Sequence, residues 1–170
     1  HAAFLAIGAY THAYLLAQGW PFPVSILCAT LLSSLVGAII GIPALRMTGI
    51  YLAVATLAFA IIVEQVLSHW VSVTGGFRGM AVELPSIGSF SLDGSVTFYF
   101  LCLFILTGCL LLALNLLRTS TGRAMTAIRD SEISAQSMGI HLAYTKTLAF
   151  GISAGFTGLA GSLLAHKIGY

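Results

Sequence analysis

The sequence predicts an all-α protein, a polytopic bundle of transmembrane helices with about five spans and one short helix at a membrane face. Only 7% of its 170 residues are charged, whereas soluble domains carry about a quarter. The mean hydropathy is +1.00. Two uncharged runs, residues 94–117 and 147–166, are long enough to cross a bilayer, which takes about 20 apolar residues. We therefore expect a single transmembrane domain over residues 1–170, and the net charge of +2 does not indicate nucleic acid binding.

The five expected spans follow from apolar length and from the residues that interrupt it. They are residues 1–17, 24–42, 50–68, 96–117 and 146–165. The first is expected to lack its beginning, and we interpret the chain as an internal piece of a longer protein, cut at both ends. Residues 72–95, between the third and fourth spans, are rich in Gly, Ser and Pro and show no helical period, which predicts a loop.

Basic residues orient the bundle, since cytoplasmic loops of membrane proteins carry an excess of Lys and Arg. Five helices in series place most of the basic residues on one side: Arg46, Arg118, Arg123, Arg129 and Lys146. Arg78 and Lys167 fall on the opposite side. This imbalance predicts that loop 118–146 is cytoplasmic and that loop 72–95 is external.

Small residues recur at helical spacing on the second, third and fifth spans, which predicts that these are the tightly packed inner helices. Helices in lipid approach closely through small side chains, because little hydrophobic force drives them together. The third span carries Ala53, Thr56 and Ala60 on one face, while the fourth, rich in Leu and Phe, is expected to face lipid. The glycines expected to serve helix packing are Gly37, Gly41, Gly151, Gly155, Gly158 and Gly161. A second interpretation, in which some small residues line a passage, stays open.

Glu64 is the only acidic residue inside an expected span. Ionisable residues in membranes usually face a cavity or a partner, which makes this carboxylate a candidate for a transport path. The alternative is an anchor at the membrane interface, because Glu64 lies near the end of its helix and is soon followed by His69 and Trp70.

The segment Thr74-Gly-Gly-Phe-Arg-Gly79 looks at first like a phosphate-binding loop. It lacks the Gly-Lys-Ser/Thr ending and a preceding strand, so nucleotide binding is excluded. A tight re-entrant turn, a docking point for a partner and a flexible external loop all stay open. Together with the third span, this segment supplies the residues expected along a translocation path: Thr56, Glu64, Thr74, Gly75 and Gly76.

Three further patterns do not predict an active site. Residues 151–155 match the Gly-x-Ser-x-Gly pattern of hydrolases, but that motif needs a strand-to-helix turn and a nearby base, and here it lies in an apolar helix. The five histidines stand near the expected membrane borders without ligand spacing, so neither a metal site nor a cofactor is expected. The three cysteines lie in apolar runs and are interpreted as packing thiols.

Residues 118–139 form the one charged island of the chain. Their first part, 123–129, is expected to extend the fourth span by a helical turn. Residues 130–139 are expected to form a separately capped helix across the membrane face. A helix this short is marginal alone in water and needs something to pack on. The island therefore predicts contact with a soluble partner.

Capping residues define this short helix. Asp130 is a favourable N-cap, and Glu132 strengthens the first turn through the helix dipole. Gly139 is expected to end the helix in the left-handed conformation, with Ile140 in the position of a Schellman contact.

The loop resembles the Glu-Ala-Ala…Gly loop of ABC importer permeases through Glu132, Ala135 and Gly139. Over residues 122–161 the sequence is more specifically similar to LivM-type permeases of branched-chain amino-acid importers, and the resemblance runs over almost the whole chain. The two residues after Glu132 are Ile and Ser where the broader pattern has alanines, and His141 stands where the family often has Asn.

The resemblance implies a function and a set of partners. The chain would be a permease subunit of an ATP-driven importer in a bacterial inner membrane, without an active site of its own. Its partners would be a second permease subunit, two ATP-binding subunits, an external substrate-binding protein and the lipid bilayer. The loop 118–146 would be a coupling loop, with helix 130–139 in a groove of the ATPase. The residues implied in coupling are Gly122, Arg123, Arg129, Asp130, Glu132, Ala135 and Gly139.

The resemblance favours branched-chain amino acids as the substrate, and permeases for urea and short amides stay as alternatives because they are similar in these segments. A secondary transporter is a further rival, but it would carry ionisable residues near the membrane midplane or broken helices in repeat. Only Glu64 approaches this pattern. An intramembrane hydrolase is weakened by the helical setting of residues 151–155.

Overall fold

The computed structural model describes residues 1–44, 50–76, 79–80, 86–87, 90–91 and 95–168. This part of the chain forms an all-α bundle with one small hairpin, and the predicted fold class is confirmed. The helices are α1 (Ala2–Ala17), α2 (Phe22–Ala44), α3 (Ile50–His69), α4 (Val71–Thr74), α5 (Ser95–Arg118), α6 (Ser120–Asp130), α7 (Glu132–Ser137) and α8 (Leu142–Ile168). The strands β1 (Ser86–Ile87) and β2 (Phe90–Ser91) pair antiparallel.

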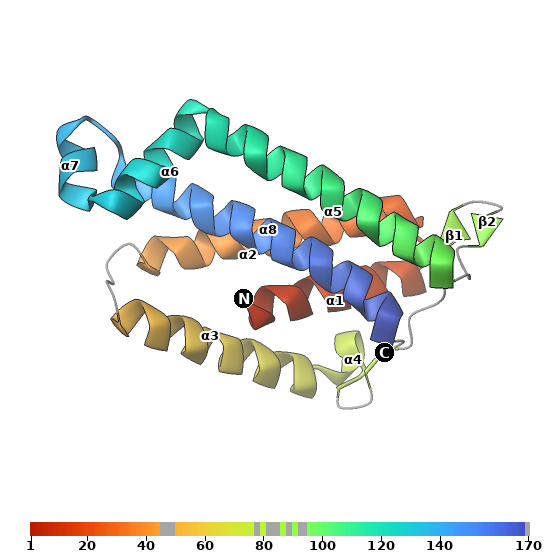
Figure 1. The fold of residues 1–170 in the computed structure, drawn as a ribbon. Helices are drawn as coiled ribbons and strands as arrows, with labels where there is room; N and C mark the ends of the chain where they lie inside the picture. The colour runs from red at the N-terminus through yellow and green to blue at the C-terminus, as the bar shows by residue number, and fades with distance from the viewer. Residues whose placement is uncertain (45–49, 77–78, 81–85, 88–89, 92–94, 169–170) are drawn as a thin grey trace.

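The long helices lie beside one another and alternate in direction (Figure 1). In the described ranges, α2, α3, α5 and α8 are long and apolar enough to cross a membrane, and α1, with 16 residues, is shorter. One end of the bundle carries α6 and α7, here called the α7 end. The opposite end carries α4, the strands and the C-terminal end of α8, and is called the α4 end. Loop 118–146 and the described residues of loop 72–95 therefore lie at opposite ends, and Arg46 and Arg78 fall outside the described residues.

α8 lies at the centre of the bundle and packs most extensively on α2 and next on α1. The contacts run through glycines. A Cβ added at Gly158 would overlap the side chain of Ser33 in α2. One added at Gly8 of α1 would overlap the backbone of Gly158, and one at Gly161 would overlap the carbonyl of Leu5. Three backbones meet here, and only residues without a side chain allow such an approach.

Buried hydroxyls link the same three helices. Ser33 is fully buried and donates a hydrogen bond to the carbonyl of Phe4 in α1 at 3.4 Å. Ser162 of α8 lies with its hydroxyl 3.3 Å from the carbonyl of Gly8 and 3.1 Å from that of Gly158. Interhelical hydrogen bonds in membranes contribute about 0.6–2 kcal/mol each. The second and fifth spans are thus inner helices, as their small residues predict.

The remaining packing glycines lie along the contact between α2 and α8. A Cβ at Gly37 would overlap the side chain of Ala154, and one at Gly41 would come within 3.2 Å of Phe150. Gly151 and Gly155 both face Ser34 of α2. The small residues of these two spans therefore form a continuous seam over several helical turns.

The third span is not an inner helix, and the prediction from its small residues is wrong. No residue of α3 is buried, and α3 contacts α1 more than any other helix. Ala53, Thr56 and Ala60 border cavities and do not press against another backbone. α5 agrees with its expected lipid-facing position, because none of its spanning window is buried.

The approach at Gly158 provides a test of the packing. Replacing Gly158 with Ala places a methyl group on Ser33, and overpacking of this kind costs roughly 1–3 kcal/mol. The matched control is Gly108→Ala in α5, where a Cβ meets open space and alanine favours the helix by about 1 kcal/mol. We expect a lower thermal unfolding midpoint in detergent for Gly158→Ala only. Equal midpoints would contradict the seam.

Candidate functional site

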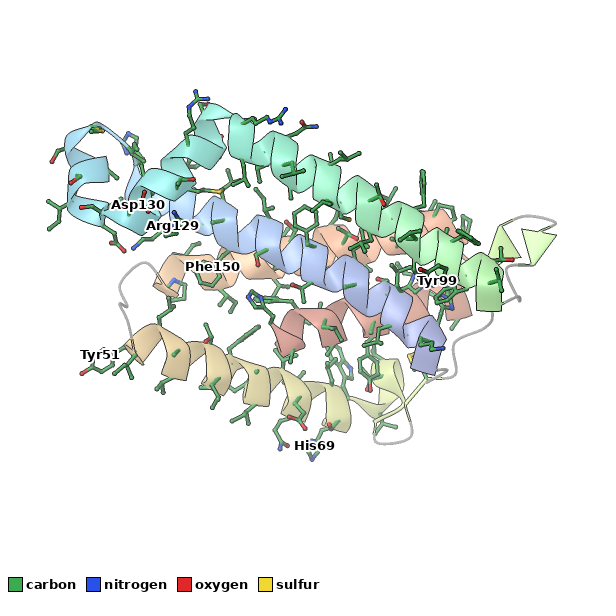
Figure 2. The ribbon with its side chains drawn as sticks, viewed as in Figure 1. Tyr51, His69, Tyr99, Arg129, Asp130 and Phe150 are labelled. Carbon is green, nitrogen blue, oxygen red and sulfur yellow. The ribbon has the colours of Figure 1, made fainter. Side chains whose placement is uncertain are left out.

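A loop built from α6 and α7 stands at one end of the bundle (Figure 2). α6 is a separate helix and not the predicted extension of the fourth span. Its N-cap is Thr119, whose hydroxyl accepts a hydrogen bond from the amide of Gly122 at 3.2 Å. Gly122 is buried, and a Cβ there would overlap the carbonyl of Leu116. The glycine lets the chain fold back on the end of α5, so α6 turns away from the axis of α5 (Figure 1).

The N-cap of α7 is Ser131 and not Asp130, which corrects the prediction. Ser131 has an extended backbone, and its hydroxyl accepts a hydrogen bond from the amide of Ser134 at 3.3 Å. Asp130 is the last residue of α6, and its carboxylate lies 3.1 Å from the guanidinium of Arg129. Both side chains are exposed, so this pair contributes little to stability. Ser and Asp are equally favourable N-caps, and composition alone does not choose between neighbours.

α7 ends at Gly139 in a Schellman motif, as predicted. Gly139 has a φ of +81°, its amide donates to the carbonyl of Gln136 at 3.0 Å, and the amide of Ile140 donates to that of Ala135 at 3.1 Å. These are the two hydrogen bonds of the motif. Nothing lies within 4 Å of a Cβ built at Gly139. Backbone conformation, and not space, therefore requires glycine here.

An ion pair ties α7 to α8. The Nζ atom of Lys146 lies 2.7 Å from Oε1 of Glu132, and it joins the first turn of α7 to the beginning of α8. On the inner side of α7, Ala135 is 2% exposed. On its outer side, Ile133 and Met138 are 81% and 80% exposed. α7 is thus fixed to α8 while it presents two large apolar side chains outward.

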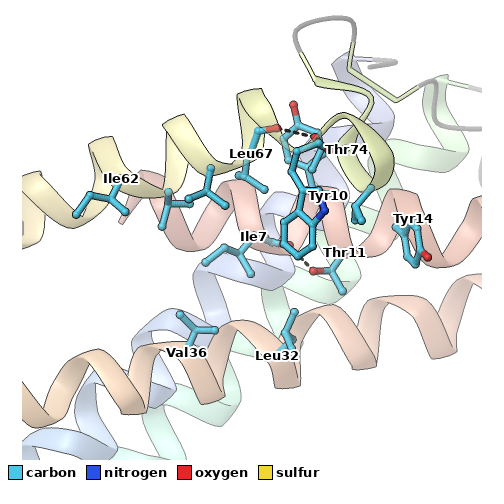
Figure 3. A pocket seen from close by; sticks show the side chains of 13 residues that line it. Ile7, Tyr10, Thr11, Tyr14, Leu32, Val36, Ile62, Leu67 and Thr74 are labelled. Carbon is cyan, nitrogen blue, oxygen red and sulfur yellow. Dashed lines mark hydrogen bonds between the residues drawn. The ribbon is translucent and has the colours of Figure 1, made fainter.

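Three adjoining cavities follow the side of α3 that faces α1 and α2. The first, of about 340 Å³, includes Thr56. The second, of about 270 Å³, includes Glu64 and shares Ala60 with the first. The third, of about 410 Å³, includes Thr74 and shares Tyr10 with the second (Figure 3). Three of the expected path residues therefore border cavities that follow one another along α3, and the three cavities together are here called the α3 groove.

Thr74 orders the turn that follows α3 and α4. Its hydroxyl oxygen lies 2.6 Å from the carbonyl of Leu67 and 2.8 Å from that of Trp70, and it accepts a hydrogen bond from the amide of Gly76 at 3.2 Å. Gly75 and Gly76 have φ values of +72° and +62°. Of the alternatives for this segment, a tight turn is present as far as Gly76, and residues 77–78 lie outside the described part.

Two features of the structure are not predicted by the sequence. Tyr10 borders both the second and the third cavity, and no pattern in an apolar run distinguishes one tyrosine from another. His12 of α1 and His166 of α8 are 154 positions apart, yet their Nε2 atoms lie 2.7 Å apart beside Phe22. One ring nitrogen donates and the other accepts, so the pair joins α1 to α8 near the α4 end. No group of three His, Cys, Asp or Glu residues in the described ranges is arranged to hold a metal ion.

The Gly-x-Ser-x-Gly pattern has a packing role. Residues 151–155 lie in the interior of α8, where Gly151 and Gly155 face Ser34. A nucleophilic serine of a hydrolase needs the sharp turn between a strand and a helix, and this helix has no such turn. The pattern therefore gives no support to an intramembrane hydrolase.

The whole sequence, residues 1–170, is similar to the sequences of known permeases. Residues 1–170 match the family model for the permease component of branched-chain amino acid transport systems. The high-affinity branched-chain amino acid transport system permease proteins LivM of Salmonella typhimurium and Escherichia coli are 35% and 34% identical, over all of this chain and 46% of each relative.

The name of a third relative refers to a different transported molecule. The autoinducer 2 import system permease protein LsrC of an Enterobacter species is 31% identical over 90% of this chain and 43% of its own length. The chain thus spans less than half the length of these relatives. No solved structure matches it.

The ion pair between α7 and α8 is tested by exchanging its charges. Glu132→Lys and Lys146→Glu each place like charges together, and we expect faster hydrogen exchange of the α7 amides in both variants. The double variant restores an attractive pair and should return exchange to the original rate. A partly exposed pair is worth about 0.2–1 kcal/mol, so the change amounts to roughly two- to fivefold. If the double variant exchanges as fast as the single variants, the pair does not hold α7.

Proposed function

The chain belongs to the family of permease components of branched-chain amino acid transport systems, and on that premise we propose that it is a membrane-spanning part of an ATP-driven amino-acid importer. The observation that carries the proposal is the attachment of α7 to the central helix α8. α7 is short, separately capped at both ends and presents Ile133 and Met138 outward, which suits a helix that docks on another protein. The chemistry of ATP hydrolysis would take place in that partner.

The proposed coupling path begins at the outer side of α7. Ile133 and Met138 would enter a groove of an ATP-binding subunit, since large exposed apolar side chains mark protein contact sites. A push on α7 would pass to α8 through the pair of Glu132 with Lys146. The Schellman turn at Gly139 makes the connection short and defined. α8 would then carry α1 and α2 with it as a rigid body, because the glycine seam leaves no space for sliding.

The other residues that the family resemblance implies in coupling lie around α6, next to α7. Gly122 permits the turn from α5 into α6, and Arg123 holds that turn by donating from Nη1 to the carbonyl of Arg118 at 2.9 Å. Arg129 and Asp130 pair on the surface at the end of α6. We propose that they contribute charge to the docking surface and do not shape α7 itself.

The proposed assembly contains a second permease subunit, two ATP-binding subunits and an external substrate-binding protein. In a bacterial inner membrane, the α7 end would face the cytoplasm and the α4 end would face outward, following the excess of basic residues in loop 118–146. The α3 groove would then form part of the translocation path, with Thr56, Glu64 and Thr74 along it, and with Gly75 and Gly76 setting the turn at its outer end. Branched-chain amino acids are the proposed cargo.

Substitution of Gly139 tests the docking role of α7. In Gly139→Val a β-branched residue must adopt a φ of +81°, which costs of order 1–3 kcal/mol and distorts the end of the helix. We expect loss of co-purification with the ATP-binding subunits and loss of leucine uptake, with membrane insertion unchanged. Gly139→Asn should keep both activities, because Asn tolerates the left-handed conformation.

The matched control for this test is Gly19→Val. Gly19 has a φ of +82° with nothing within 4 Å of its Cβ position, so the backbone strain is the same, but the residue lies in the turn after α1. This variant should still co-purify with the ATP-binding subunits. If Gly139→Val also co-purifies and transports leucine, α7 is not the docking helix.

Orientation is tested by single-cysteine labelling in intact cells. Val71 and Ser137 are exposed residues at the α4 end and the α7 end. With a membrane-impermeant maleimide, we expect Val71→Cys to react from outside and Ser137→Cys to react only after permeabilisation. The reverse pattern would place the α7 end outside and would remove α7 from contact with any ATPase.

A further inference from the structure

We propose that the second and third cavities of the α3 groove form one subsite for a primary ammonium group that carries a short branched aliphatic chain. Glu64 binds the ammonium, and the apolar cavity beside Tyr10 takes the aliphatic chain. This inference rests on the proposed transport function and names the residues of the path that would recognise the cargo.

The carboxylate half of the subsite is the cavity of about 270 Å³ around Glu64. Its walls include four alanines of α1 and α3, whose small side chains leave the space beside the carboxylate open. In the described ranges no basic side chain pairs with Glu64. A carboxylate within a spanning helix is costly unless a partner or a cavity compensates it, and a ligand cation would supply that compensation.

Two further polar side chains, Ser68 and Tyr10, border the cavity around Glu64. Ser68 lies one turn along α3, and its hydroxyl donates to the carbonyl of Glu64 at 2.8 Å. The proton of that hydroxyl is thereby committed, so its oxygen is available to accept a hydrogen bond from an ammonium group. Tyr10 lines the same cavity from α1. An ammonium group has three donors, and these three side chains offer it acceptors on both sides of the groove.

The apolar half is the cavity of about 410 Å³ (Figure 3), within the range of roughly 300–1,000 Å³ typical of small-molecule sites. The hydroxyls of its two threonines are committed: Thr11 donates to the carbonyl of Ile7 at 2.6 Å, and Thr74 donates to carbonyls at the end of α3 and in the following turn. Branched aliphatic side chains from three helices form much of the wall: Ile7, Leu32, Val36, Ile62, Val63 and Val66.

The two halves adjoin because Tyr10, Val63 and Leu67 line both. In the proposed subsite, a ligand of a few heavy atoms would place its cationic head in the cavity around Glu64 and its aliphatic tail in the neighbouring one, past these three side chains. Among the described residues, no Lys, Arg or His lines either cavity, and in the proposed subsite a carboxylate on the same ligand would point along the groove. An uncharged amide such as urea would fill neither half well.

The test uses the full-length importer, with its native cysteines replaced by alanine, reconstituted in phosphatidylcholine vesicles. Thr11 points into the apolar cavity (Figure 3). A cysteine substituted there reports whether a ligand occupies this cavity, because a bound ligand slows the reaction of the thiol with a small methanethiosulfonate reagent. We expect leucine and leucinamide to slow this reaction severalfold. Urea and 4-methylpentanoate, which has the aliphatic chain and the carboxylate but no ammonium, should not slow it.

Substitutions of Glu64 provide the second part of this experiment. In a Glu64→Gln background leucine should no longer protect the cysteine, whereas Glu64→Asp should keep part of the protection. A cysteine at Val71, which is 68% exposed and lines neither cavity, serves as the matched control and should react at one rate under all conditions. Gly139→Val should lose uptake but retain protection, which separates failure of coupling from failure of the subsite.

Four outcomes would overturn the proposal. Protection by 4-methylpentanoate equal to that by leucine would show that no ammonium is recognised. Protection that survives Glu64→Gln would remove the carboxylate from the site. A cysteine at Thr11 that never reacts would show that another helix fills the cavity. Protection by phosphatidylethanolamine in the vesicles, with no further effect of leucine, would assign the ammonium site to a lipid head group.

Discussion

The close approach of α8 to α1 and α2 is the constraint on which the rest of the structure depends. Gly8, Gly158 and Gly161 let three backbones meet, and buried Ser33 and Ser162 add hydrogen bonds across the same junction. In lipid, apolar side chains gain little by leaving one apolar surrounding for another, so contact of this kind depends on shape and on polar links. The result is a rigid unit of three helices with α8 at its centre.

Contacts at both ends of the bundle connect neighbouring helices to α8. At the α7 end, Glu132 and Lys146 hold α7 against the beginning of α8. At the α4 end, His12 and His166 join α1 to α8 beside Phe22. A displacement applied to α7 would therefore reach the opposite end of the bundle through one continuous helix, without bending a loop or sliding a helix pair. This is the mechanical requirement for a part that receives motion from outside the membrane.

α3 is packed much more loosely than α1, α2 and α8. Its small residues face the rigid unit but do not reach it, and the space between becomes the α3 groove. The first two cavities of the groove follow α3 from Leu52 to Ser68, a rise of about 24 Å at 1.5 Å per residue. A helix that is loosely held beside a rigid unit can move relative to it at low cost. The same looseness leaves room for a ligand and keeps Glu64 out of a closed core.

The sequence by itself determined which segments are the long apolar helices, because a span in lipid must satisfy its backbone hydrogen bonds within itself; it did not predict the short helix α4 at the start of the expected loop 72–95. The end of α7 at Gly139 was equally predictable, since a left-handed residue is a local requirement. Only the tertiary structure decided that α6 breaks from α5, that Ser131 and not Asp130 caps α7, and that the small residues of α3 line cavities. Each of these depends on which surface lies opposite, and the spacing of residues along one chain does not contain that information.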